Sequence, residues 1–97
     1  MNIVVHPAAI VDLNNAANFY AERANKQLGL ALIVEFEKAV LFLSNNPELG
    51  TKWVSGTHRF IMHRFPFNVV YRIFPDHLYI IAIAHQRRRP DYWRQRT

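Results

Sequence analysis

The chain has 97 residues, of which 51% are hydrophobic and 20% are charged. This length and composition predict one folded domain rather than a disordered chain. The absence of cysteine excludes disulfides, thiolate metal sites and cysteine nucleophiles. The longest apolar run, Ile80–Ala84, is too short to span a membrane, and the first residues lack the pattern of a signal peptide. We therefore expect a cytoplasmic protein with no membrane-spanning segment.

The positive charge of the chain is concentrated in its C-terminal part. The formal net charge is +5. Residues 59–97 contain eight arginines, no lysine and two acids, whereas residues 1–58 contain four basic and five acidic residues. Guanidinium groups bind phosphates and carboxylates in a forked geometry. This distribution indicates an anionic partner, either nucleic acid or an acidic protein segment, with a merely solubilising basic surface as the alternative.

The first half of the chain predicts a short strand and two amphipathic helices. Ile3–Val5 is rich in β-branched residues, and Pro7 suits the first turn of a helix. The first helix carries apolar residues at helical spacing, namely Ile10, Leu13, Ala16, Ala17 and Tyr20. The second begins near the capping residue Asn25 and ends before Pro47. Its apolar stripe, assigned to the core, is Leu28, Leu32, Phe36, Val40 and Leu43.

The second half predicts three antiparallel strands, over Arg59–Phe65, Phe67–Phe74 and Leu78–Ala84. The last of these is apolar on both sides, which indicates an interior strand. The tail, Arg88–Arg96, is expected to form a short helix with Pro90 in its first turn. The fold class is therefore α+β, in the order strand, helix, helix, three antiparallel strands, short helix. The helical hairpin is predicted to pack on one face of a small, mainly antiparallel sheet.

Side chains alternate between the two faces of a strand, so the strand sequences separate an apolar face from a polar face. The apolar set, expected to face the helices, is Phe60, Met62, Val69, Tyr71, Ile73, Leu78, Ile80 and Ala82. The opposite set, expected to share an open face, is Arg59, His63, Asn68, Arg72, Tyr79 and His85. A sheet face with arginine, histidine and tyrosine side chains suits a phosphate backbone.

Two segments give the chain a resemblance to a known family. They are Arg64–Arg72 (RFPFNVVYR) and Ile81–Arg88 (IAIAHQRR), and with the element order they resemble the RelE/ParE toxins of type II toxin–antitoxin (plasmid stabilisation) modules. The resemblance covers nearly the whole chain, so residues 1–97 are expected to form a single RelE/ParE-like toxin domain. It implies a small basic toxin that is neutralised by a cognate antitoxin, an extended or helical segment of which wraps the toxin.

The resemblance leaves the target open. RelE-like members cut messenger RNA on the ribosome, whereas ParE-like members poison DNA gyrase, and one fold serves both activities. RelE-like nucleases usually add lysines near the second strand, and this chain has only Lys52 in that region. A ParE-like activity on gyrase is therefore favoured over a metal-independent RNA endonuclease. A non-catalytic domain that binds nucleic acid or antitoxin is a third alternative.

The chemistry of RNA cleavage, together with the resemblance, nominates candidate site residues. Cleavage needs a proton carrier and charge stabilisation at the phosphate. His85 is the candidate acid or base. Arg72, together with Arg87 or Arg88, is the candidate phosphate ligand, and Tyr92 is the residue that orients the substrate or donates a proton. The candidate residues for substrate or partner binding are Arg59, His63, Arg64, Arg87, Arg88 and Arg89.

These candidates also have structural interpretations. Arg72 can instead pair with Asp76 or with a helix carboxylate, His85 can be a satisfied histidine at a strand end, and Arg64 can fix the turn before Pro66. Tyr92 and Trp93 can simply hold the tail on the sheet.

Other kinds of site have less support. The histidines lack metal-ligand spacing and no phosphate-binding loop is present, so neither a metal nor a cofactor is expected. Apolar residues left exposed on the second helix, such as Ile33 or Phe42, are candidate antitoxin contacts.

Overall fold

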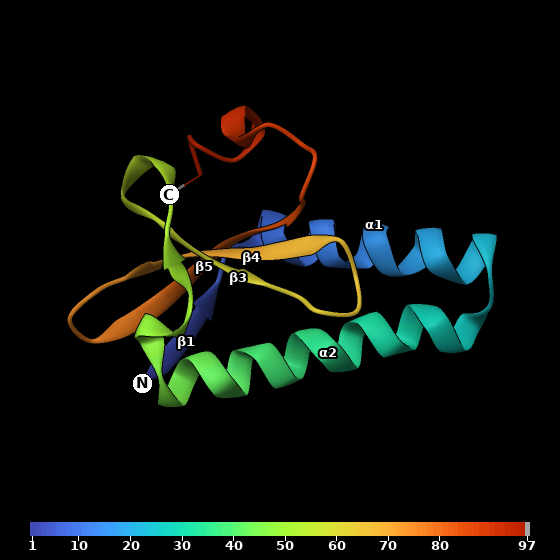
Figure 1. The fold of residues 1–97 in the computed structure, drawn as a ribbon, viewed down its shortest axis with the longest axis horizontal. Helices are drawn as coiled ribbons and strands as arrows, with labels where there is room; N and C mark the ends of the chain where they lie inside the picture. Colours follow the sequence, from blue (N-terminus) through green and yellow to red (C-terminus); the bar gives the residue numbers. More distant parts are fainter. Residues whose placement is uncertain (97) are drawn as a thin grey trace.

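The structure, a computed structural model, describes residues 1–96. A five-stranded sheet carries a helical hairpin on one face, which confirms the predicted α+β class (Figure 1). The elements are β1 (Asn2–Val5), α1 (Pro7–Arg23), α2 (Lys26–Asn45), β2 (Thr51–Lys52), β3 (His58–Ile61), β4 (Phe67–Ile73) and β5 (His77–His85). Three single 3-10 turns lie at Pro47–Leu49, Val54–Gly56 and Pro90–Tyr92.

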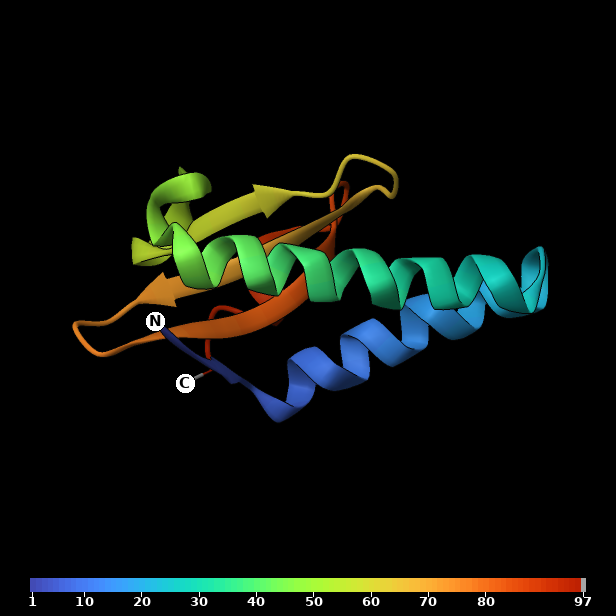
Figure 2. The same ribbon diagram turned by 90° about the horizontal axis from the view of Figure 1, so that it is seen from below.

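The strands are ordered β1-β5-β4-β3-β2. Only β1 and β5 run parallel, and the other neighbours are antiparallel. The strand β5 lies inside the sheet, as its two apolar faces predicted. Figure 2 shows α2 in front of the sheet, α1 alongside it and part of the C-terminal segment behind the sheet.

Local sequence explains where the helices begin and how closely they pack. His6 caps α1, because its Nδ1 accepts a hydrogen bond from the Ala8 N–H at 2.9 Å. Asn25 caps α2 as predicted, accepting from the Leu28 N–H at 2.8 Å. The two helices approach closely at Gly29, where an added Cβ would lie 2.6 Å from the carbonyl oxygen of Ala17. A larger residue at this position would force the two helices apart.

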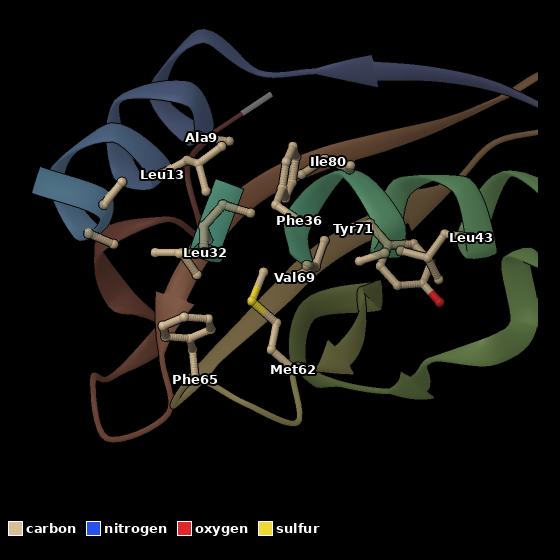
Figure 3. Close-up of a cluster of buried hydrophobic side chains, with 14 of the residues drawn as sticks. Ala9, Leu13, Leu32, Phe36, Leu43, Met62, Phe65, Val69, Tyr71 and Ile80 are labelled. Atoms are coloured by element: carbon tan, nitrogen blue, oxygen red, sulfur yellow. The ribbon is translucent and has the colours of Figure 1, made fainter. Parts of the chain in front are cut away.

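The main core lies between the hairpin and the sheet. Leu32, Phe36 and Leu43 of α2 are buried, and the rest of the predicted stripe packs against them. In Figure 3 these three side chains face the sheet residues Val69 and Tyr71, among others. Burial of this apolar surface is the main driving force for docking the hairpin.

One core position of α1 was predicted wrongly. Ile10 is 41% exposed, and Ala9 is fully buried in its place. The buried residues of α1 that follow, Leu13, Ala16 and Ala17, continue at helical spacing from Ala9. In a helix that starts at Pro7, Ile10 therefore lies outside the buried stripe that Ala9 and Leu13 belong to.

The pairing of β4 with β5 contains a bulge that the sequence pattern did not reveal. The register steps from Val70↔Ala82 to Tyr71↔Ile80, which leaves Ile81 as an extra residue. An extra residue exchanges the two faces for everything after it. Ile83 consequently lies in the main core, while Ala82 lies in a second cluster. The prediction that Ala82 faces the helices is wrong for this reason.

The face predicted to be open is covered. Trp93, only 1% exposed, packs over Val70, Ile81, Ala82 and Ala84. Side chains at the margin of this second cluster are Trp53, Val54, Tyr79 and Tyr92. The C-terminal segment and the Val54–Gly56 turn thus close the face that the alternation pattern left to solvent. We call this cluster the tail-side core.

Several element boundaries also differ from the prediction. The strand β3 ends at Ile61 rather than Phe65, because the Met62 N–H donates to the Phe67 carbonyl at 3.0 Å and residues 62–66 form a tight loop. In the described part of the tail, up to residue 96, the predicted helix is limited to the 3-10 turn Pro90–Tyr92, with Pro90 at its start. The short β2 and the turns around it were not predicted. In the part of the chain that is described, no helix is long and apolar enough to cross a membrane.

Candidate functional site

His85 and Arg72 lie far apart. His85 is paired with Phe67 at the start of β4, whereas Arg72 is paired with Tyr79 near its end. The five-residue separation along β4 corresponds to roughly 17 Å. The bulge at Ile81 also turns His85 to the helix-covered face, while Arg72 lies on the tail-covered face. The prediction that they share one face is therefore wrong.

His85 sits at the end of β5 against an aromatic neighbour. Its ring meets Phe67 edge-on, with ring centroids 5.3 Å apart. The Arg87 backbone N–H donates to Nδ1 of His85 at 3.1 Å. Because Nδ1 is the acceptor in this bond, a neutral His85 ring carries its proton on Nε2.

His85 and Tyr92 line the same shallow hollow, together with Arg88. Its volume is about 200 Å³, and its remaining wall comes from Asp12, Asn15, Ala16, Phe67 and Ile83. The Arg88 guanidinium lies 3.8 Å from the centre of the Tyr92 ring, a cation–π contact. The structure therefore brings His85, Tyr92 and one of the expected phosphate ligands, Arg88, to one hollow, without Arg72.

The phenol of Tyr92 is held in its protonated form. Burial, helped by the nearby Asp12 carboxylate, raises its pKa to about 12, and the positive charges of Arg88 and Arg96 oppose this rise. At neutral pH the Tyr92 hydroxyl is therefore a hydrogen-bond donor and not a base.

Arg72 and Arg59 contact the turn before β3. The Arg72 guanidinium donates to the Ser55 carbonyl at 2.6 Å, and Ser55 has a left-handed backbone with φ of 59°. Arg59 lies over the Trp53 ring at 3.6 Å. Arg72 thus makes a fold contact, but with a backbone carbonyl rather than with Asp76 or a helix carboxylate.

The other candidate binding residues come from two neighbouring loops. His63 and Arg64 lie in the loop over residues 62–66, and Arg87–Arg89 follow β5; all are exposed. The Gln86 N–H donates to the Pro66 carbonyl at 2.8 Å, which places the two loops side by side. We call these five residues the arginine end. Within residues 1–96, the side chains of Arg87 and Arg89 make no hydrogen bond or ion pair.

Two of the predicted alternatives can be judged from these loops and from α2. Arg64 donates its backbone N–H to the Glu35 carboxylate at 3.4 Å, so its main chain helps to position the loop while its side chain is exposed. Of the two candidate antitoxin contacts, Phe42 is 53% exposed. Ile33 is only partly exposed, because it packs against the main core.

Comparison with known proteins identifies the family. The sequence matches the family described as ParE toxin of type II toxin–antitoxin system, parDE, over residues 3–90. The chain belongs to the ParE toxin family. A solved structure of the chromosomal ParDE TA system from P. aeruginosa has a TM-score of 0.78 and 19% sequence identity, covering 88% of this chain and 95% of that one. That likeness is one of fold, and no curated protein matches the chain.

An ion pair next to the hollow of this ParE-family toxin was missed by sequence reasoning. Arg96 donates to both carboxylate oxygens of Asp12, at 2.7 and 3.3 Å. Arg96 also donates to the Ile81 carbonyl of β5, and Asp12 also accepts from the Ile83 N–H. They thereby satisfy backbone groups beyond the point where β1 stops pairing. No local signal announces this pair, since 84 residues separate its members.

The arrangement suits binding of an anionic group by the ParE-family toxin. The acid in the hollow, Asp12, is already paired with Arg96, so it repels an incoming anion less than a free carboxylate would. Arg88 borders the hollow, and Arg87 and Arg89 extend the positive charge around it. In the described residues, no three histidine or carboxylate side chains are grouped to hold a metal ion.

Proposed function

We propose that this ParE-family toxin arrests growth by binding DNA gyrase, without cleaving RNA, and that a cognate antitoxin keeps it inactive. The observation that carries the proposal is the separation of Arg72 from His85 and Tyr92. Cleavage of RNA requires a proton carrier and a phosphate ligand at one phosphodiester. The roughly 17 Å between Arg72 and His85, and the contact of Arg72 with Ser55, speak against that assembly.

The arginine end is the surface that we propose for contact with anionic groups of partners. Its exposed guanidinium groups come from two adjoining loops, which a backbone hydrogen bond joins. Acidic side chains of gyrase or of the antitoxin, or phosphates of gyrase-bound DNA, have the charge that this surface would bind.

One observation favours a second candidate, a RelE-like messenger RNA endonuclease. His85, Tyr92 and Arg88 line one hollow, so Arg88 is able to replace Arg72 as phosphate ligand. In that case His85 would carry the proton, because the raised pKa of Tyr92 makes its phenol a poor general base.

Incorporation of labelled thymidine and labelled methionine after induced expression separates the two candidates. We expect thymidine incorporation to fall first, and purified toxin to inhibit supercoiling by gyrase in vitro. An earlier fall in methionine incorporation, with cleavage of ribosome-bound messenger RNA that is lost in His85→Ala, would replace gyrase by the endonuclease alternative.

A pair of double variants tests the arginine end. Arg87→Ala/Arg89→Ala removes two unpaired guanidinium groups, and we expect gyrase inhibition to weaken at least about tenfold, the effect of losing one or two charged contacts. Arg23→Ala/Lys26→Ala removes the same charge near the junction of the two helices and is the matched control. If both double variants inhibit gyrase equally weakly, the overall charge of the toxin matters and the position of these arginines does not.

A further inference from the structure

The outer face of α2 carries apolar side chains that the fold leaves exposed. Leu30 is 55% exposed, Val34 is 47% exposed and Leu41 is 61% exposed. Because successive residues of an α-helix are turned by about 100°, these three positions lie opposite the buried stripe of the same helix. They are therefore separate from the main core, and we call them the outer stripe.

The outer face of α1 has a different character. The exposed residues on that face include Asn14, Asn15, Asn18 and Glu22, which suit contact with water. Both helices pack against the same core, so the hairpin itself does not require an apolar outer face. A helix with apolar side chains on two opposite faces is typical of one that is covered on both.

Two residues of opposite charge flank the outer stripe. Glu37 and Lys38 are both exposed, and they lie about 50° to either side of Val34 and Leu41 around the helix. The hairpin, residues 7–45, contains three basic and four acidic residues. The outer stripe therefore has nearly neutral surroundings and lacks the concentrated positive charge that would attract an acidic segment.

We propose that two copies of this chain associate through their outer stripes, with the two α2 helices parallel about a two-fold axis. Val34 and Leu41 of one copy then each meet their own counterpart in the other copy. A two-fold axis parallel to the helices exchanges the two flanks, so Glu37 of each copy lies beside Lys38 of the other. These reciprocal pairs make the surface complementary to itself.

Charge also selects the parallel orientation over the antiparallel one. Antiparallel helices that pair Val34 with Leu41 would have their two-fold axis perpendicular to the helices. Each flank would then stay on its own side, with Glu37 facing Glu37 and Lys38 facing Lys38. Like charges facing each other across an interface are unfavourable.

The proposed contact leaves the tail side of each copy open. In Figure 1, α2 lies below the sheet and the C-terminal segment, which includes Arg88 and Tyr92, lies above it. A dimer joined at α2 therefore carries two separate C-terminal segments. The inference concerns association alone and is the same whichever target the toxin has.

Sedimentation of the purified chain tests association directly. One helix face per copy makes a small interface, so we expect a weak dimer with a Kd on the order of 10 μM, and a monomer below about 1 μM. Leu41→Glu places a charge in the outer stripe, and Val11→Glu places one at a residue of α1 that is 56% exposed. We expect the Kd to rise at least about tenfold for Leu41→Glu and less than about twofold for the control. A parent chain that stays monomeric up to about 200 μM would overturn the proposal.

Single cysteines test the orientation, because the chain has no cysteine of its own. Parallel helices bring positions 34 and 41 each within disulfide reach of their counterparts, so Val34→Cys and Leu41→Cys should both give linked dimers on oxidation. Antiparallel helices allow this for at most one of the two, since the positions lie about 10 Å apart along the axis. Asn18→Cys, exposed on α1, is the control and should stay unlinked. Linkage at only one position of α2, or at neither, would overturn the proposal.

Charge reversal tests the flanking pairs. Glu37→Lys and Lys38→Glu each set like charges face to face, and we expect the Kd of each variant to rise about tenfold. Mixed in equal amounts, the two variants present two lysines to two glutamates and should associate at least as well as the parent chain. A mixture that associates no better than either variant alone would contradict the parallel arrangement.

A segment of the cognate antitoxin is the competing occupant of the outer stripe. If the parent chain stays monomeric and Leu41→Glu abolishes binding of purified antitoxin, the antitoxin covers this face and the proposal fails. Growth arrest is a separate readout. A chain that dimerises without arresting growth would contradict the proposed function and leave the dimer standing. Circular dichroism confirms that each variant is folded before use.

Discussion

The two faces of the sheet are covered in different ways. On one face, two long helices pack a continuous core whose members include Leu32, Phe36 and Leu43. On the other, a short tail and a turn of three residues cover a smaller cluster around Trp93. In Figure 1, α2 lies below the sheet and the C-terminal segment lies above it.

The two covers contribute differently to stability and to function. Helices with a full apolar stripe cannot leave the sheet without unfolding the protein. A tail held by Trp93 and by the Asp12–Arg96 pair can detach while the rest stays folded. The tail side also carries Arg88 and Tyr92, so the candidate site borders the less stable of the two covers.

The largest loss of stability is expected for a substitution in the core under the helices. Leu32 is fully buried, and Leu32→Ala removes its contacts and leaves a cavity, which should lower the free energy of unfolding by about 3 kcal/mol. Leu30, 55% exposed on the same helix, supplies the control, since Leu30→Ala should cost about 0.5 kcal/mol or less. Urea denaturation measures both. Comparable losses in the two variants would contradict the placement of the main core.

A smaller and local effect is expected on the tail side. Trp93→Ala should destabilise by about 2 kcal/mol, less than for a central core tryptophan, because the loss is limited to the free energy that docks the tail. Limited trypsin digestion should then cut faster at Arg87–Arg89 but not at Lys38. Equal acceleration at both places would show that the two faces unfold as one unit.

The smallest expected effect is a loss of folding stability at alkaline pH. Burial raises the pKa of Tyr92 from 10.0 to about 12, so the folded state holds this proton more tightly than the unfolded chain does. The resulting stability is complete below pH 10 and is lost as the pH rises toward 12. Because Tyr92 is partly exposed, we expect a loss of only about 1 kcal/mol.

Tyr92→Phe isolates this contribution. Burial also raises the pKa of Tyr20 and Tyr71, and both tyrosines remain in the variant. Urea denaturation at pH 9 and pH 11 should therefore show a smaller drop in stability for Tyr92→Phe than for the parent chain. An identical drop would mean that the Tyr92 phenol is solvated in the folded state.

Local sequence patterns predicted most of the helix-covered half of the molecule. Apolar spacing in α2 identified its core stripe, Asn25 marked its start, and the two apolar sides of β5 indicated an interior strand. Such patterns are local, because they follow from the geometry of one helix or one strand. The segment Arg64–Arg72 and the end of β5 carried the family resemblance in the same way.

The tail-covered half depends on contacts between distant parts of the chain. The bulge at Ile81 exists because β4 and β5 pair with a one-residue offset, and a single strand sequence does not contain its partner's register. This offset put His85 and Arg72 on opposite faces of the sheet. The Asp12–Arg96 pair likewise depends on where β1 stops and where the tail returns. Contacts between residues far apart in the chain arise only once the sheet has formed, and they placed the candidate site.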